Sequence, residues 1–181
     1  MKYFRKLIGD RIYLSPMQAE DAETYVKWLS DPCVTDGLGS SSRVLSVDAE
    51  KEWIKSNAST QQFAIVRKVD DQLIGNCGLH QIDQMRQCAE AGLFIGDEEN
   101  RGKGFGAEVL NLLLAHAFDT LNLNNVMLRV FAFNERAIRC YENVGFHEMG
   151  RRRQSYFVRG KFHDEVFMDI LRDDFNAGRT S

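Results

Sequence analysis

The chain has 181 residues, of which 44% are hydrophobic and 27% charged, and its formal net charge at pH 7 is −3. This length fits one domain with its own apolar core, so we predict a single domain spanning residues 1–181. The composition excludes a disordered or fibrous chain, and the slightly acidic balance argues against a nucleic-acid-binding module, which normally carries a basic excess.

The sequence predicts neither a secretory leader nor a membrane span. The positively charged N-terminus could open a signal peptide, but the apolar stretch that should follow is broken by Gly9, Asp10 and Arg11. The longest apolar run without a charge, around Val109–Phe118, is too short to cross a bilayer. We therefore expect a cytoplasmic protein without a membrane partner.

The four cysteines and four histidines show no spacing typical of a metal site or a disulfide framework. No C-x-x-C pair occurs, and the histidines are scattered along the chain. We therefore expect no metal, and reduced thiols in a reducing compartment. The cysteines are Cys33, Cys77, Cys88 and Cys140.

Hydrophobic periodicity in the first half of the chain predicts strands that alternate with two helices. Asp31-Pro32 should end the first helix, Ser46 should cap the second, and Trp28 and Trp53 should anchor them in the core. The stretch Gly37–Ser42 is rich in glycine and serine and is predicted to be a loop. The predicted strands and helices, in chain order, are Arg11–Leu14, Asp21–Leu29, Val47–Asn57, Gln62–Lys68, Gln72–His80 and Cys88–Ile95.

The second half contains the clearest helix, Gly106–Leu121, in which apolar residues follow the i, i+3, i+4 pattern through three turns. Asn125–Phe133 is apolar at both alternating sets of positions, which is typical of a strand covered on both faces. Glu135–Val144 is predicted to be a short helix that Gly145 ends. The two closing strands are Phe146–Phe157 and Lys161–Leu171.

A glycine-rich turn follows the strand Cys88–Ile95 and leads straight into the clearest helix. Such a turn is a ready anion site, because the first N–H groups of a helix have no intrahelical partner and the helix dipole favours negative charge there. Glycine lets the backbone approach a phosphate closely, and an arginine and a lysine add positive charge. The residues of this turn are Arg101, Gly102, Lys103, Gly104, Phe105 and Gly106.

Two common nucleotide motifs fit this turn poorly. A P-loop needs Ser or Thr after its lysine, whereas Gly104 follows Lys103, and the spacing from Gly96 is one residue too long. Gly102, Gly104 and Ala107 can be fitted to a dinucleotide fingerprint, but the turn does not leave the strand directly and no carboxylate stands about 20 residues later. A nucleotide-binding oxidoreductase is therefore disfavoured.

A family pattern fits better. Arg101–Gly106 resembles the [Q/R]-x-x-G-x-[G/A] signature of the GNAT acetyltransferases, which hold the coenzyme A pyrophosphate at a helix N-terminus. Asn134–Phe146 resembles the N-x-x-A-x-x-x-Y-x-x-x-G-F block of the same superfamily, in the expected order. The resemblance extends over nearly the whole chain and is closest to the ribosomal-protein N-terminal acetyltransferases and the spermidine acetyltransferases.

The resemblance implies a single GNAT-like N-acetyltransferase domain of the α/β (α+β) class over residues 1–181. Its central sheet should be mixed, mostly antiparallel and of about seven strands, with about four helices on both faces. The implied protein is a cytoplasmic acyltransferase that uses acetyl-CoA as co-substrate and needs no metal. Family habit suggests a homodimer, and no direct nucleic-acid partner is expected.

The implied reaction moves the acetyl group to a primary amine by direct attack in a ternary complex. The acceptor would be a protein N-terminus, a polyamine or a small amine. The alternative from another class is a non-catalytic domain that binds or senses acetyl-CoA. Tyr141 speaks against that alternative, because binding alone has no need of an acid.

Two residues are the catalytic candidates. By resemblance, Tyr141 donates a proton to the departing thiolate, although a core tyrosine would occupy the same helical face. Related enzymes carry a glutamate where Glu90 stands, so it is the candidate base, and an exposed charge at a strand end is the equal alternative. His80 and His163 are further candidates for the base.

The remaining candidates would bind the coenzyme. In the family, the strand that ends at Ile95 splays from its neighbour, the pantetheine arm lies in the opening, and a backbone N–H stabilises the oxyanion. Asn134 would reach the pantetheine, or would simply be a turn residue at a strand end. The predicted coenzyme-binding residues are Leu93, Phe94, Ile95, Arg101, Gly102, Lys103, Gly104, Phe105, Gly106 and Asn134.

Overall fold

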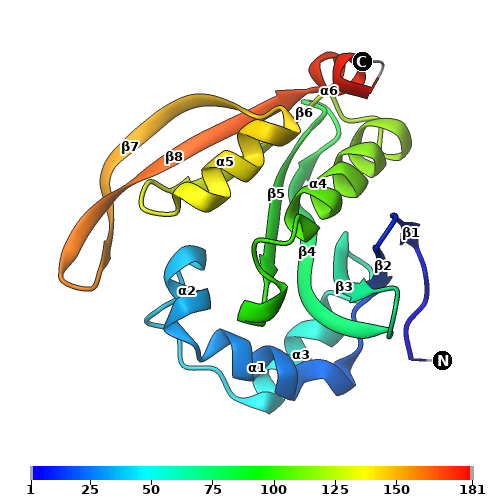
Figure 1. The fold of residues 1–181 in the computed structure, drawn as a ribbon, viewed down its shortest axis with the longest axis vertical. Coiled ribbons are helices and arrows are strands. Elements are labelled where there is room, and N and C mark those ends of the chain that lie inside the picture. Colours follow the sequence, from blue (N-terminus) through cyan, green and yellow to red (C-terminus); the bar gives the residue numbers. More distant parts are fainter. Residues whose placement is uncertain (1, 180–181) are drawn as a thin grey trace. The chain divides into compact units, whose positions relative to one another are not determined.

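The computed structural model describes residues 2–179, which form two compact units. The first unit comprises the residues up to 78 together with 93–109, and the second comprises 79–92 together with the residues from 110 onward. Three elements contribute residues to both units: β4 (Gln72–Asp83), β5 (Cys88–Ile95) and α4 (Phe105–Ala115) (Figure 1). The expectation of a single domain stays a prediction.

The first unit is built from antiparallel strands and three helices. β1 pairs with β2, β2 with β3, and β3 with β4. Tyr13 and Val66 from the strands, and Ala22, Tyr25 and Trp28 from one helix, are buried in its core. Besides parts of β4, β5 and α4, this unit contains β1 (Leu7–Ile8), β2 (Ile12–Pro16), α1 (Ala22–Leu29), α2 (Pro32–Leu38), α3 (Val47–Ser56) and β3 (Gln62–Arg67).

Helix α2 was missed by the sequence prediction, which assigned a loop from Gly37. Asp31-Pro32 ends α1 as expected, but it also opens α2: Asp31 Oδ1 accepts a hydrogen bond from the Cys33 amide at 2.9 Å, and proline suits the first helical position. The helix ends at Gly39, whose φ of 69° is left-handed. The loop therefore begins two residues later than predicted, after Leu38.

The phenol of Tyr25 is buried without a hydrogen-bond partner among the described residues. A buried unpaired hydroxyl costs about 1–3 kcal/mol, so Tyr25→Phe should raise the free energy of unfolding by about 1 kcal/mol and Tm by about 2–4 °C. Denaturation by urea and by heat measures both. Tyr13→Phe is the matched control, because the Tyr13 hydroxyl donates to Asp71 at 2.8 Å and its removal should lower stability. Equal effects of the two changes would contradict this account.

The second unit contains a parallel pair of strands. β5 runs parallel to β6, and β6 and β7 are each antiparallel to β8. Gly145, predicted as a helix boundary, caps α5 of this unit, and Ser46, also predicted, caps α3 of the first unit. The elements that this unit adds are β6 (Asn125–Phe131), α5 (Glu135–Val144), β7 (His147–Val158), β8 (Lys161–Leu171) and α6 (Arg172–Arg179).

The strands follow the order β1-β2-β3-β4-β5-β6-β8-β7 in a mixed, mostly antiparallel sheet. This confirms the predicted fold class with a small correction: the described residues form eight strands and six α-helices, where about seven and about four were expected. The short β1 and the helices α2 and α6 account for the difference. No helix in residues 2–179 is long and apolar enough to cross a membrane.

Strand β6 is covered on one face, so the prediction of a doubly covered strand was wrong. Val126, Leu128 and Val130 are buried, as expected for a central strand. On the alternate face, Met127 and Phe131 are half-buried, and Arg129 between them is exposed. The apolar residues of this second face therefore misled the prediction, and the arginine between them marks a more polar surface.

The long helix is interrupted near its end. Its α-helical part, α4, ends at Ala115 and continues as a π-helical turn, His116–Thr120, in which the Leu121 amide donates to the His116 carbonyl at 3.0 Å. The predicted apolar face is confirmed, because Leu110, Leu113, Leu114, Ala117 and Phe118 are all buried.

Candidate functional site

The glycine turn in the first unit has the backbone of an anion site. Gly102 and Gly104 have φ values of 72° and 82°, a left-handed conformation that favours glycine. A Cβ atom at Gly102 would meet no atom within 4 Å, so the space beside this residue is open. The first hydrogen bond of α4 runs from the Glu108 amide to the Gly104 carbonyl, which leaves the N–H groups of the preceding turn without an intrahelical acceptor.

Two arginines brace this turn. The guanidinium of Arg101 donates to the Ile95 carbonyl at 3.1 Å and also to the Gly96 carbonyl. Arg11 donates to the Lys103 carbonyl at 2.8 Å and to the Glu108 carboxylate at 3.1 Å. Arg101 therefore shapes the turn through the protein backbone, while the side chain of Lys103 is exposed.

The pairing between β5 and β6 ends early. It covers Cys88–Glu90 against Asn125–Met127, although both strands continue beyond these residues. In the described part of the chain, Ala91 and Gly92 have no partner residue on β6. The pairing of these two strands therefore stops at Glu90, and the splay near Leu93–Ile95 stays a prediction.

Glu90 lies at this last paired position and is held by neighbouring side chains. Arg129 donates to Glu90 Oε1 at 2.7 Å, and Gln81 donates to Oε2 at 3.4 Å. The other end of the Arg129 guanidinium lies 3.6 Å from Glu165 Oε1. Because the Glu90 side chain is half-buried, with 16% of it exposed, and ion-paired, it is not the free strand-end charge that was the alternative.

His80 packs against the part of β5 that lies beyond its pairing with β6. A Cβ atom built on Gly92 would lie 3.3 Å from His80 Nε2, so the imidazole packs directly against that glycine. Burial lowers the pKa of His80, which keeps the ring neutral and able to accept a proton near pH 7. His163 instead packs edge-on against Phe133, with ring centroids 4.7 Å apart.

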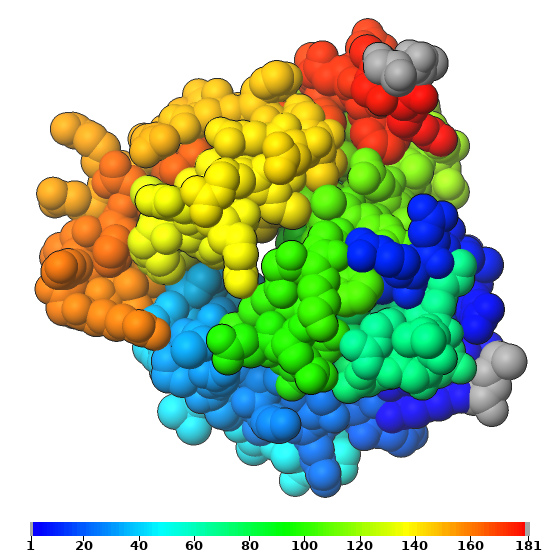
Figure 2. Space-filling view, in the orientation of Figure 1, coloured from blue at the N-terminus to red at the C-terminus, as the bar shows by residue number. Residues whose placement is uncertain are grey.

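Asn134 precedes α5 and Tyr141 lies on it, and this helix is at the surface of the second unit (yellow in Figure 2). Asn134 Oδ1 accepts from the Ala137 amide at 3.3 Å, so this side chain caps the helix, a role that the sequence analysis did not predict. Its amide NH₂ group retains donors of its own. Burial raises the pKa of Tyr141 to about 12, and the phenol therefore stays protonated at physiological pH.

The predicted site residues fall into two groups. Leu93–Ile95 and Arg101–Gly106 belong to the first unit, whereas Glu90, Asn134 and Tyr141 belong to the second. No cluster of three potential metal-ligating His, Cys, Asp or Glu side chains occurs within residues 2–179.

Sequence reasoning missed the arginines that organise these groups. Arg129 could have been noticed as a lone charge within an otherwise apolar strand. Arg11 offered no such signal, because its partners Lys103 and Glu108 are more than 90 residues away in the chain.

A protein-family model described as an acetyltransferase (GNAT) domain matches residues 11–147, which is well over half of the chain. The chain belongs to the GNAT acetyltransferase family. The family resemblance inferred from the two motifs is thus confirmed. The matched range includes both the glycine turn and the Asn134–Phe146 block.

Named GNAT relatives cover much of the chain. An uncharacterized N-acetyltransferase, p20 of Bacillus licheniformis, is 28% identical over 93% of this chain and 97% of the relative. The putative ribosomal N-acetyltransferase YdaF of Bacillus subtilis is 31% identical over 70% of this chain and 68% of the relative. The spermidine N(1)-acetyltransferase of Vibrio cholerae is 32% identical over 61% of this chain and 64% of the relative.

Solved structures support the GNAT fold. Spermidine N-acetyltransferase from Vibrio cholerae, in complex with CoA and spermine, matches with a TM-score of 0.84 and 24% identity over 92% of this chain and 98% of that one. A GNAT-family acetyltransferase from Bacillus anthracis matches with a TM-score of 0.81 and 17% identity, over 92% and 98% respectively. At these identities the likeness is one of fold.

Proposed function

We propose that this chain is an N-acetyltransferase that moves the acetyl group of acetyl-CoA to a primary amine in a ternary complex. The observation that carries the proposal is Tyr141, which stands in the family's tyrosine position and keeps its proton because burial raises its pKa to about 12. A domain that only bound acetyl-CoA would have no need of this protonated donor.

The coenzyme would bind at the glycine turn of the first unit. Its pyrophosphate fits the open backbone at Gly102 and the first N–H groups of α4, with Lys103 adding charge. Its pantetheine arm would follow Leu93–Ile95 of the same unit, and the family resemblance assigns Asn134 of the second unit to the coenzyme as well. These residues suit an extended, polyanionic ligand.

The reaction needs a neutral amine, a stabilised oxyanion and a protonated leaving group. The amine nitrogen attacks the thioester carbonyl, a C–N bond forms, and the C–S bond breaks. The proton lost by nitrogen passes to Glu90 or His80, and a backbone N–H of Leu93–Ile95 stabilises the oxyanion. Tyr141 supplies a proton to the departing thiolate.

The state of two thiols supports direct attack over an acetyl-cysteine intermediate. Burial raises the pKa of the Cys140 thiol and, more strongly, that of Cys77. A protonated thiol is a poor nucleophile, so neither group is prepared to take the acetyl group.

The names of the relatives support the class of acceptor. One is a putative ribosomal N-acetyltransferase and another a spermidine acetyltransferase, which both point to amines. We therefore propose a protein N-terminus, a polyamine or a small amine as acceptor for this chain, acting in the cytoplasm as a homodimer. The second candidate function is a non-catalytic acetyl-CoA sensor, and the assay below distinguishes it from an enzyme.

A thiol-release assay with acetyl-CoA tests the proposal against spermidine, peptides with ribosomal-protein N-termini, and aminoglycosides. Turnover on one class, with kinetics that require both substrates to be bound together, is the expected result. A chain that binds CoA but releases no thiol with any of these acceptors would favour the sensor.

A further inference from the structure

Trp28 of α1 contacts the segment that leads into the glycine turn. Its indole Nε1 donates to Asp97 Oδ1 at 3.0 Å, and its side chain is 4% exposed. The two residues are 69 positions apart in the chain, and both belong to the first unit, as does the glycine turn itself. The hydrogen bond therefore ties α1 to the connection between β5 and α4.

The backbone at Gly96 lies directly against the tryptophan ring. A Cβ atom there would come within 2.1 Å of Trp28 Cδ2 and Cε2, so only glycine fits. On the preceding strand, Phe94 meets the same indole edge-to-face, with ring centroids 6.1 Å apart. Trp28 thus fixes the chain on both sides of the end of β5.

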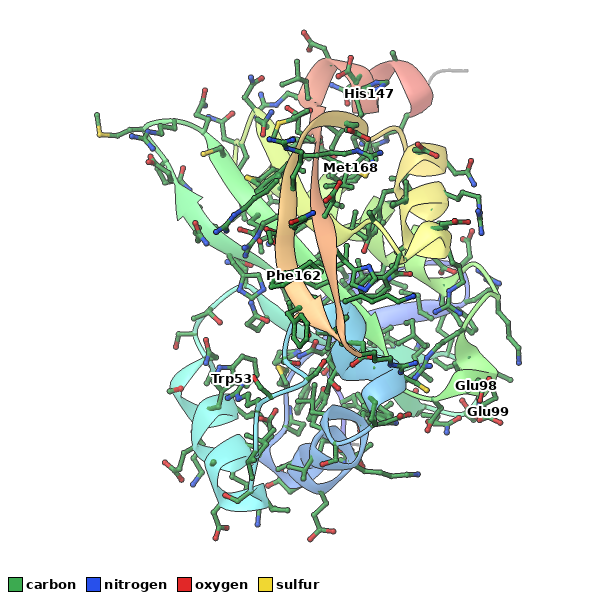
Figure 3. All side chains as sticks on the ribbon, turned by 90° about the vertical axis from the view of Figure 1, so that its left-hand side faces the viewer. Trp53, Glu98, Glu99, His147, Phe162 and Met168 are labelled. Atoms are coloured by element: carbon green, nitrogen blue, oxygen red, sulfur yellow. The ribbon has the colours of Figure 1, made fainter. Side chains whose placement is uncertain are left out.

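Asp97 uses its carboxylate for this contact and not for the local turn. It occupies the N-cap position of the 3₁₀ helix η2 (Glu98–Asn100), where aspartate commonly accepts from a backbone amide, but its side chain makes no capping bond. Its neighbours Glu98 and Glu99 point outward (Figure 3). The choice of partner indicates that Asp97 serves the contact with α1.

Two side chains hold the start of this connection, one from earlier in the chain and one from later. Trp28 holds Gly96 and Asp97, while Arg101 holds the carbonyls of Ile95 and Gly96. Gly102, which carries the open backbone of the anion site, follows after the short helix η2. A shift at Gly96 would therefore move the N–H groups that would meet the pyrophosphate.

We propose that Trp28 and Asp97 are positioning residues for the coenzyme, and that their hydrogen bond sets the path of the glycine turn. The inference rests on the proposed function, since it assumes that the turn binds CoA. Neither side chain needs to touch the ligand. The bond acts by holding the backbone in the conformation that binds.

Calorimetric titration with CoA tests the proposal. Trp28→Phe and Asp97→Ala should each raise Kd for CoA about two- to tenfold, the range expected for the loss of one hydrogen bond. Asp97→Ala leaves the packing of the indole intact, so it reports on the bond alone. Asp97→Asn keeps an oxygen acceptor and should restore most of the affinity. The double variant should bind no worse than the weaker single variant, because both changes break the same bond.

Trp53→Phe is the matched control. Trp53 lies on α3 and is partly buried against the core cluster that contains Trp28 (Figure 3). Within residues 2–179, no hydrogen bond or ring contact joins its side chain to the glycine turn. The substitution should lower Tm while Kd for CoA stays at the wild-type value. In this background Trp28 is the remaining tryptophan of the two in the chain, so its fluorescence should change on CoA binding.

The outcomes separate the two proposals. If wild type binds CoA and both Trp28→Phe and Asp97→Ala bind it equally well, with only Tm lowered, the contact is merely structural and the inference is wrong. If wild type itself does not bind CoA, the proposed function fails and the inference fails with it.

Discussion

Tyr141→Phe should lower kcat about 100-fold and leave Kd for CoA unchanged, the loss typical of removing a positioned general acid. The substitution keeps the ring, which packs near Phe146 with centroids 6.1 Å apart, and removes only the hydroxyl. Without that proton donor, the thiolate must leave unassisted. Steady-state kinetics with acetyl-CoA and the best acceptor measure kcat, and calorimetry with CoA measures the affinity.

The protonation of Tyr141 adds a pH test of the same role. Because burial raises its pKa from 10.0 to about 12, the phenol keeps its proton throughout the neutral and mildly alkaline range. Wild-type kcat should therefore show no decline due to Tyr141 below pH 10, and any ascending limb should belong to the base. Tyr141→Phe should lower the whole profile without moving that limb.

Tyr25→Phe is the control for this substitution. It removes the same atom from a fully buried tyrosine, whose hydroxyl has no hydrogen-bond partner among the described residues. Its kcat should match wild type. A Tyr141→Phe variant with wild-type kcat would contradict the acid role and would reduce Tyr141 to a core residue.

Local signals explain why parts of the fold and site could be predicted. The bounds of α5, Glu135–Val144, agree with the prediction because a side-chain cap at Asn134 and a left-handed glycine at Gly145 mark its two ends. The glycine turn was equally visible, since Gly102 and Gly104 adopt the positive φ values for which glycine is needed. Both motifs depend on neighbours in the sequence, so the chain alone could reveal them.

Contacts between distant segments explain what could not be predicted. The partner of Glu90 is Arg129, 39 residues away, and the partner of Trp28 is Asp97, 69 residues away. No periodicity encodes such pairs, because they depend on which strands and helices become neighbours in the folded chain. Helix α2 was missed for a different reason: Asp31-Pro32 is both a stop signal and a start signal.

Gly102→Ala should raise Kd for CoA more than about tenfold, because the methyl group would occupy the open space that a phosphate needs to approach the backbone. The substitution should also cost about 1–2 kcal/mol of folding free energy, since φ is 72° and an L side chain is strained there. Loss of stability alone could weaken binding, so the comparison needs a glycine with the same strain outside the turn.

Gly160 provides that comparison in the turn between β7 and β8. Its φ is 78°, and a Cβ atom there would also meet no atom within 4 Å. Gly160→Ala should therefore lose a similar free energy of unfolding and keep the wild-type Kd for CoA. If Gly102→Ala binds CoA as wild type does, the glycine turn does not hold the pyrophosphate. If both variants lose affinity equally, the effect comes from stability, and the left-handed backbone at Gly102 has no special role in binding.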